Sequence, residues 1–326
     1  MILHGVRVIE IDGLKDKSLD FSAIGKLKKI IKQEAPDIVH THASLSARIA
    51  AKVYGKCKIV YTRHCDFPIS PKYKYKIVRF TNRVLNESLA DKIIVTSIPT
   101  KENLMKQGLS DEKIEVVING VNELRETSEA QKQELKKKYN IKDDEIIVGY
   151  LARLEELKGH KFLIEAAKII KDEKKSNVKY KFLIMGSGAY EETAKNMVKE
   201  LNLEEEVIFT GFIKEVEQML NITDIQINAS YLSEGTTLSL LEGMSLGLPT
   251  VATKCGGNPY IIEENKNGLL VEKADSKSLA DGIQRIVEDK EAFDKMKERS
   301  KEIFKQKYTS KIYAGNIEKI YESLVK

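Results

Sequence analysis

Short apolar runs alternate with longer amphipathic segments along almost the whole chain of 326 residues. In the first part, runs rich in Val and Ile predict strands at 6–11, 37–41, 58–62, 92–97 and 114–118. Between them, apolar residues at helical spacing predict helices over 21–34, 43–55, 75–90 and 99–108. Nearly every strand position is apolar, as in a parallel sheet that helices cover on both faces. The order therefore predicts a doubly wound α/β sheet.

A polar and charged stretch at 119–145 interrupts this alternation, and a second series then begins. Its strands are predicted at 146–152, 180–186, 206–211, 224–230, 249–253 and 267–272. Three helical stretches with no strand between them follow the last strand. We therefore predict two similar α/β domains joined near residue 122. Their expected bounds are 1–122 and 123–305, with a final helix at 306–326.

The beginning of the first domain departs from the usual α/β pattern. A nucleotide-binding domain of this class usually opens with a strand, a glycine-rich turn and a helix. Here Met1 falls almost directly on a predicted strand, and no G-x-G-x-x-G follows any early strand. The absence of that motif argues against a dinucleotide-dependent oxidoreductase. We expect the first domain to be incomplete.

Charge is distributed unevenly between the two parts. Residues 1–118 carry 21 Lys and Arg against 13 Asp and Glu, a net charge of +8, and the remainder carries −3, which together give +5. A basic first half suggests an anionic partner, although a merely solvated surface explains it equally well. The three cysteines have no C-x-x-C spacing, and no apolar run is long enough for a membrane span. We therefore expect a cytoplasmic protein.

Two carboxylates interrupt the apolar segment "SEGTTLSLLEGMSLGLP" at 233–249, namely Glu234 and Glu242. A buried carboxylate needs a partner or a ligand, because burying it alone is costly. Eight residues of straight helix span roughly 12 Å, so both acids can border one elongated ligand. The N–H groups around Thr237 and Leu238 lie between them and predict an anion site at a helix N-terminus. The alternative is a pair of solvated helix charges.

Two cations follow the first strand of the second series, in "GYLARLEELKGH" at 149–160. Arg153 lies just past this strand, and Lys158 lies at the start of the next helix. Both positions are outside the carboxyl end of a parallel strand, where α/β sheets bind ligands. Arg and Lys there can neutralise a diphosphate and stabilise it as a leaving group. Two solvated surface cations are the alternative.

These motifs resemble the retaining family 4 glycosyltransferases of the GT-B fold. The resemblance rests on "YLARLEELKG", the two acids with seven residues between them, "GLPTVAT" followed by "GG", "NGLLV", "INGVN" and "FTGF", in the family's order. It extends from about Asp37 to the C-terminus. It implies two Rossmann-like parallel-sheet domains that face a cleft, with the last helix returning to the N-terminal domain.

The resemblance also implies roles for the acids and cations. Residues that match Arg153 and Lys158 bind the diphosphate of the sugar donor, together with the amides around Thr237 and Leu238. The residue that matches Glu234 contacts the transferred sugar, and the one that matches Glu242 holds the ribose hydroxyls. The family needs no obligatory metal or other cofactor, and UDP-sugars are its commonest donors.

Histidines follow two strands of the first domain. His64 stands at the exit of a strand in "VYTRHCDFP", and the family often has a histidine here that is proposed to stabilise the reacting centre. His40 and His42 share one strand face. The two could bind a metal, although no third ligand with clear spacing is visible; His42 could contact the acceptor, or both could pack at the strand end.

The most basic stretch, at 70–87, interleaves cations with aromatic and aliphatic residues. Such a helix suits an anionic membrane surface, and 72–83 is the expected contact. A nucleic-acid groove could use the same residues, but nothing else supports one. A solvated helix face is the simplest alternative.

The resemblance implies a retaining hexosyltransferase that moves a sugar from a nucleoside-diphosphate sugar, above all a UDP-sugar, to a hydroxyl acceptor. A glycolipid or polysaccharide precursor at the inner face of the membrane is the expected acceptor. Two alternatives remain open: a non-catalytic nucleotide-sugar-binding homologue, and a nucleotide-sugar epimerase of the same fold.

Overall fold

The computed structural model describes residues 2–3, 5–13, 17–64, 68–173, 177–232 and 234–326. The chain divides into two compact units. The N-terminal unit comprises residues 1–117 and 316–326, and the C-terminal unit comprises residues 118–315. The division thus falls slightly before the boundary predicted near residue 122. Among the described residues, every helix is too short or too polar to cross a lipid bilayer.

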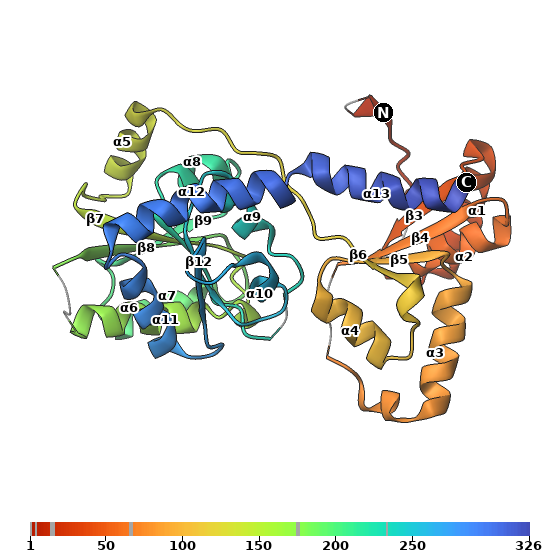
Figure 1. Ribbon diagram of the computed structural model, residues 1–326, viewed down its shortest axis with the longest axis horizontal. Coiled ribbons are helices and arrows are strands. Elements are labelled where there is room, and N and C mark those ends of the chain that lie inside the picture. The colour runs from red at the N-terminus through yellow and green to blue at the C-terminus, as the bar shows by residue number, and fades with distance from the viewer. Residues whose placement is uncertain (1, 4, 14–16, 65–67, 174–176, 233) are drawn as a thin grey trace. The chain divides into compact units, whose positions relative to one another are not determined.

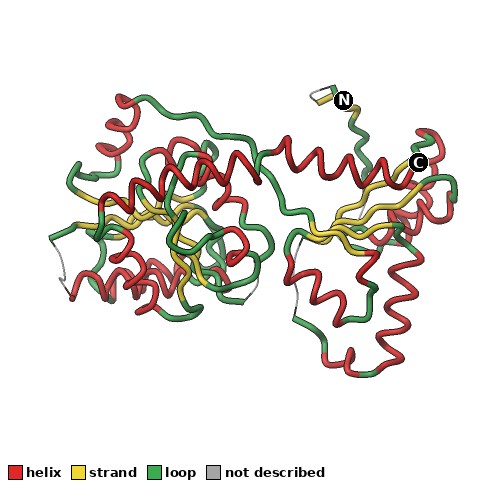
Figure 2. Tube along the Cα trace, viewed as in Figure 1, coloured by secondary structure: helices red, strands yellow, loops and turns green. Residues whose placement is uncertain are grey.

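The N-terminal unit is built on a parallel sheet of four strands in the order β3-β4-β5-β6 (Figures 1 and 2). The strands are β3 (Ile38–His42), β4 (Lys58–Arg63), β5 (Lys92–Val95) and β6 (Ile114–Val116). The connecting helices are α1 (Phe21–Glu34), α2 (Leu45–Tyr54), α3 (Lys76–Ser88) and α4 (Ile98–Lys106). Each agrees with its sequence prediction to within a few residues.

The first predicted strand of this unit is wrong. Instead of a parallel strand at 6–11, β1 (Ile2–Leu3) and β2 (Val6–Arg7) form a separate antiparallel pair. Val6 and Arg7 are exposed, and so are residues 9 and 10 that follow. The apolar run therefore has the composition of a core strand, but it is not covered by helices.

The C-terminal unit contains a parallel sheet of six strands in the order β12-β11-β10-β7-β8-β9. The strands are β7 (Glu145–Leu151), β8 (Lys179–Met185), β9 (Val207–Gly211), β10 (Ile225–Asn228), β11 (Thr250–Thr253) and β12 (Gly268–Val271). All six agree with the predicted series. Helices α6 (His160–Glu173), α7 (Glu191–Glu200) and α11 (Ser276–Ile286) cover one face of this sheet.

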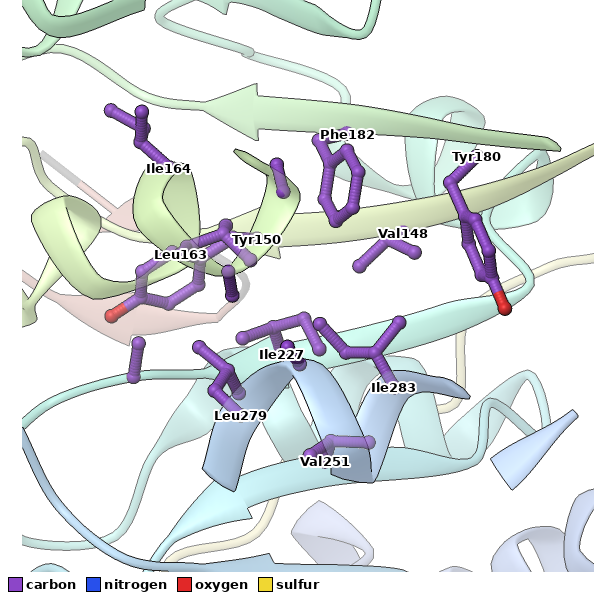
Figure 3. Close-up of a cluster of buried hydrophobic side chains, with 14 of the residues drawn as sticks. Val148, Tyr150, Leu163, Ile164, Tyr180, Phe182, Ile227, Val251, Leu279 and Ile283 are labelled. Carbon is purple, nitrogen blue, oxygen red and sulfur yellow. The ribbon is translucent and has the colours of Figure 1, made fainter. Parts of the chain in front are cut away.

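Buried side chains on this face form the main core of the unit (Figure 3). Val148 and Tyr150 of β7 meet Phe182 of β8, while Leu163 and Ile283 come from the covering helices. The opposite face is covered by three short helices and one long one. These are α8 (Val216–Asn221), α9 (Leu238–Ser245), α10 (Asn258–Ile261) and the long α12 (Lys290–Lys307). Both faces are buried, which explains why the strands read as continuous apolar runs.

Two helices outside the βα alternation complete the chain. α5 (Glu129–Lys138) lies in the charged stretch that the sequence analysis left without structure, and Ser128 and Gln131 form a capping box at its start. α13 (Ser310–Val325) is the last helix, and its residues from Asn316 onward group with the N-terminal unit. There Ile317 and Ile320 are buried, and the Tyr321 hydroxyl lies 2.6 Å from His40 Nδ1. The final helix therefore returns to the N-terminal unit, as the family resemblance implies.

Candidate active site

The order of strands in the C-terminal unit marks one place in its sheet as a ligand site. From β7 the chain continues to β8 and β9 on one side, and β10 then pairs with the other side of β7. The direction of strand addition reverses between β7 and β10. In open α/β sheets, ligands bind outside the carboxyl ends of the strands at such a reversal. Arg153 lies in the loop after β7, Lys158 ends the 3₁₀ turn η3 (Glu156–Lys158) that follows, just before α6, and Glu234 lies in the loop after β10, so all three lie at this edge.

Lys158 and Glu234 form a direct ion pair across the two loops. Lys158 Nζ lies 2.7 Å from Glu234 Oε1, and the two side chains are 17% and 8% exposed. The residue after Lys158 allows this approach, because Gly159 has a φ of +71° and an added Cβ would lie 2.1 Å from the Ala229 carbonyl oxygen. Gly256 does the same on the other side of Glu234, since its Cβ would lie 2.0 Å from the Glu234 carbonyl oxygen. Neither glycine can carry a side chain.

A buried polar network holds the Glu234 carboxylate. Ser230 Oγ donates to Glu234 Oε1 at 2.5 Å, and Asn228 Nδ2 donates to the same oxygen at 3.4 Å. Asn258 Nδ2 in turn donates to Asn228 Oδ1 at 3.1 Å. Ser230, Asn228 and Asn258 were not among the site residues predicted from the sequence. Their signal was a polar side chain at the end of an apolar strand, in "INAS", and one directly after the "GG" of the next loop.

The N-terminus of α9 is left open for an anion. Thr237 is the N-cap residue, but its side chain makes no capping hydrogen bond; its Oγ1 donates instead to Asn258 Oδ1 at 3.1 Å. Leu238, the first helical residue, is 47% exposed. The first N–H groups of a helix carry partial positive charge and lack intrahelical partners. An anion is therefore favoured in front of Thr237 and Leu238.

The predicted geometry of the two acids is wrong in one respect. Glu234 precedes α9, which begins only at Leu238, because Thr237 has extended backbone angles. The seven residues between Glu234 and Glu242 therefore do not form one straight helix, and the helical rise and rotation do not describe the separation of the two acids. Glu234 lies in the loop after β10, whereas Glu242 lies in the middle of α9.

Glu242 is a carboxylate without a protein partner in the described part of the chain. Its side chain is half-buried, and no hydrogen bond or ion pair joins its carboxylate to another described residue. Burial raises the pKa of Glu242 above its usual value of 4.5. An acceptor-only group in this position is suited to hydroxyl groups of a ligand, which would supply the missing donors.

Arg153 is the least constrained of the predicted site residues. Its side chain is 75% exposed, and its Nη1 lies 2.6 Å from Glu155 Oε1. It contacts neither Lys158 nor Glu234 in this structure. A surface ion pair of this kind is weak, so the guanidinium can leave Glu155 for a phosphate at little cost.

The N-terminal unit gathers three histidines at the carboxyl ends of β3 and β4. His42 Nδ1 lies 2.7 Å from His64 Nε2, and the rings of His40 and His42 stack with centroids 4.6 Å apart. His40 is fixed by Tyr321 and by Thr62, whose Oγ1 lies 2.6 Å from His40 Nε2. The contact between His42 and His64 was not predicted, because it joins two strands. Even so, no group of three His, Cys, Asp or Glu among the described residues is placed to hold a metal ion.

The pKa values of His40 and His64 both lie below the usual value of a histidine, which favours the neutral ring. Burial, with smaller effects from His42 and His64, lowers the pKa of His40 to about 4. Burial and the neighbouring His42 lower the pKa of His64 below 6.5. Two charged rings could not share the bond between His42 and His64, since each nitrogen would be a donor. A lowered histidine pKa contributes stability that is present above pH 6.5 and is lost as the pH falls through the folded value.

His42→Gln is expected to raise the pKa of His64 toward 6.5 without reaching it, because the charge repulsion disappears while the burial remains. Titration by heteronuclear NMR measures this value for each ring. His160, in the C-terminal unit, is the control, because burial alone dominates its pKa of about 4. An unchanged or lower pKa for His64 would show that His42 does not act on it.

Two family models cover most of the sequence. Residues 131–303 match glycosyl transferases group 1, and residues 2–125 match glycosyltransferase family 4. The first match alone spans more than half of the chain. This chain belongs to the group 1 glycosyl transferases. Its two parallel-sheet units agree with that family's GT-B fold.

Individual relatives extend over both units of this glycosyltransferase. The N-acetyl-alpha-D-glucosaminyl L-malate synthase of Bacillus anthracis is 26% identical over 99% of this chain and 84% of its own length. The UDP-Gal:alpha-D-GlcNAc-diphosphoundecaprenol alpha-1,3-galactosyltransferase of Escherichia coli is 29% identical over 83% of this chain and 71% of its own. Among solved structures, HepE of Anabaena in complex with UDP has a TM-score of 0.81 at 22% identity and covers 93% of this chain and 82% of its own.

Proposed function

We propose that this glycosyltransferase moves a sugar from a nucleoside-diphosphate sugar to a hydroxyl group of a lipid-linked acceptor, with retention of the anomeric configuration. The observation that carries the proposal is the Lys158–Glu234 pair beside the open N-terminus of α9, at the reversal between β7 and β10. It provides positive charge for a diphosphate and carboxylate oxygens for sugar hydroxyls in one place.

Each residue of the site has a proposed role. Lys158, Arg153 and the N–H groups at Thr237 and Leu238 bind the diphosphate and stabilise the negative charge that it gains on leaving. Glu234, which its polar network holds in place, accepts hydrogen bonds from hydroxyls of the transferred sugar. Glu242 accepts from the ribose hydroxyls. His64, with its ring kept neutral, acts at the reacting centre.

Retention follows if the acceptor attacks from the side on which the diphosphate leaves. The bond between the anomeric carbon and the diphosphate oxygen breaks, the acceptor oxygen bonds to that carbon, and the departing phosphate takes the acceptor's proton. The leaving charge is met by Lys158 and by the helix N-terminus, so the step needs no metal ion.

The donor and acceptor classes are supported by what the relatives bind or act on. HepE has been crystallised with UDP and with UDP-glucose. The Escherichia coli relative is named for a UDP-galactose donor and a diphosphoundecaprenol-linked acceptor. A UDP-sugar is therefore the first donor to test.

Incubation of the full chain with a panel of UDP-, GDP- and ADP-sugars and a lipid-linked acceptor tests the proposal. We expect nucleoside diphosphate and an α-linked product from an α-linked donor, at a rate that EDTA does not change. Binding of a donor without any product would favour a non-catalytic homologue. A β-linked product, or activity lost to EDTA and restored by Mg²⁺ or Mn²⁺, would contradict the mechanism.

Arg153→Ala is expected to lower kcat/KM at least about tenfold, roughly 1.4 kcal/mol of transition-state stabilisation. The fold should be unaffected, because the side chain is 75% exposed. Arg285→Ala is the matched control, since this arginine lies on α11 and donates to Asn265 Oδ1. Steady-state kinetics decide the matter, and equal kcat/KM values for the two variants would remove Arg153 from the site.

A further inference from the structure

Helix α3 and the 3₁₀ turn before it, η1 (Pro71–Lys74), lie on the surface of the N-terminal unit with their large apolar side chains exposed. No residue of α3 is buried, whereas each of the other long helices of the unit, α1 and α2, buries at least two residues. Figure 1 draws α3 beside α4, below the sheet. Asn82, Asn86 and Glu87 make hydrogen bonds to the rest of the unit, whereas its large apolar side chains Ile77, Phe80, Val84 and Leu85 are exposed.

The inward face of α3 holds to the unit through hydrogen bonds. Asn82 Nδ2 donates to the Gln107 carbonyl oxygen at 3.0 Å, and Asn86 Oδ1 accepts from the buried Arg48 at 3.2 Å. At the C-terminal end, Glu87 Oε1 accepts from the Ser110 amide and hydroxyl at 2.7 and 2.6 Å. Asn82 and Asn86 are four residues apart and therefore share one face of the helix. These contacts fix the rotation of α3.

The outward face is an apolar stripe. Ile77, Phe80 and Val84 are separated by three and four residues, which places them together on the side opposite the two asparagines. With Tyr75 and Leu85 they are 52–67% exposed. Single exposed apolar residues are common on protein surfaces, but a stripe along a whole helix marks a surface that contacts another apolar phase.

Cations border this stripe, and acids are absent from it. Lys72, Lys74, Lys76 and Arg83 lie between Pro71 and Asn86, a segment with no Asp or Glu; Arg79 lies in the same segment on the face of α3 that packs on Gly108. Arg83 is partly neutralised, because its Nε lies 3.2 Å from Glu87 Oε2; no acid within the described ranges forms an ion pair with the three lysines. Lys72 and Lys74 lie over the rings of Tyr73 and Tyr75, at 5.5 and 5.0 Å. The N-terminal unit as a whole is also basic, with the net charge of +8 that residues 1–117 carry.

We propose that this surface, formed by η1 and the outward face of α3, docks on an anionic lipid bilayer. Apolar side chains enter the boundary between headgroups and acyl chains, while the flanking Lys and Arg bind lipid phosphates. Nucleic acid would pair with the cations but would leave Ile77, Val84 and Leu85 without apolar partners. A bilayer provides an apolar phase for the stripe and phosphates for the flanking cations. The combination of the two therefore favours lipid.

Docking on lipid would hold the N-terminal unit at the surface where a lipid-linked hydroxyl is presented. Docking of this surface does not depend on the identity of the sugar or the nucleotide. Its test therefore uses binding to vesicles, so that a failed result can be distinguished from a failure of the transferase assay.

The chain contains no Trp, which allows a single fluorophore to be placed on the surface. Phe80→Trp is expected to shift its emission to shorter wavelength when the full chain meets vesicles of equal parts phosphatidylglycerol and phosphatidylcholine, because the ring leaves water. Phe21→Trp is the matched control on α1, where the phenylalanine is 77% exposed. It should not shift, and neither variant should shift with phosphatidylcholine alone.

Co-sedimentation with vesicles measures how much the apolar stripe and the flanking cations each contribute to binding. The double variant Ile77→Ser, Phe80→Ser and the triple variant Lys72→Gln, Lys74→Gln, Lys76→Gln should each lower partitioning onto the anionic vesicles at least about tenfold. Phe21→Ser removes one exposed apolar side chain from α1, and the triple variant Lys28→Gln, Lys29→Gln, Lys32→Gln removes the same number of cations from its exposed side; each should change partitioning little.

Three results would overturn the proposal. The wild-type chain could stay in the supernatant with anionic vesicles, or the α1 and α3 variants could partition equally. The α3 variants could instead break a dimer in size-exclusion chromatography without any vesicle binding, which would assign the surface to a second copy of the chain. The replaced residues are exposed, so unchanged thermal unfolding of each variant confirms that the fold is intact.

Discussion

Lys158→Met is expected to lower the rate of glycosyl transfer at least about 100-fold. It should also lower the free energy of unfolding by about 3 kcal/mol, because it leaves the Glu234 carboxylate, 8% exposed, without its cation. Ser230 and Asn228 still donate to Glu234, but two neutral donors do not replace a charge at 2.7 Å. Steady-state kinetics and urea unfolding measure the two effects.

The matched control is Lys161→Met, because Lys161 is 54% exposed and lies 3.7 Å from Glu165. Loss of this surface pair should change stability by less than about 0.5 kcal/mol and leave the rate unchanged. The double variant Lys158→Met, Glu234→Gln separates structure from function. A neutral amide can remain in the polar network, so stability should recover while turnover does not. Recovery of turnover as well would mean that the pair is only structural.

Glu242→Gln is expected to make the free protein more stable and its nucleotide binding weaker. Because burial raises the pKa of Glu242, the folded chain holds this proton more tightly than the unfolded chain. The cost of burying the charged form is therefore absent below pH 4.5 and fully present above the raised folded value. At pH 7 the variant should gain about 0.5–1 kcal/mol, and the gain should vanish near pH 4.

The affinity for nucleoside diphosphate should change in the opposite direction, with a loss of at least about tenfold, because an amide accepts ribose hydroxyls less well than a carboxylate. Thermal unfolding with and without UDP, at both pH values, gives stability and affinity from one set of samples. Glu298→Gln on α12 is the control, since Glu298 is exposed. A ligand-binding role for Glu242 would be contradicted if the stability and the nucleotide affinity of Glu242→Gln both fell or both remained unchanged.

The sequence predicts the strands and helices well because the pattern that defines them is local. Every strand of both parallel sheets was found from its apolar run, since helices bury both faces. The same criterion failed at Val6 and Arg7, where an apolar run has no helix to cover it. It also passed over α5, which is polar throughout and is marked only by its capping box at Ser128.

The sequence predicts which residues of the site follow a strand, but it does not predict which of them contact one another. Lys158 and Glu234 were identified by their positions after buried strands, but their direct pairing requires the β7–β10 contact, which joins residues far apart in the chain. The contact of His42 with His64 similarly depends on the pairing of β3 with β4. The extended backbone at Thr237, which separates Glu234 from α9, has no signal in the helical spacing.

The central claim is that a nucleoside diphosphate lies over the carboxyl ends of β7 and β10. Hydrogen–deuterium exchange of the full chain, with and without the nucleoside diphosphate that raises its thermal stability most, locates the ligand directly. We expect slower exchange of the amides at 153–160 and 234–240, where the segments after these strands and the first turn of α9 lie. Slower exchange confined to other parts of the chain would contradict it.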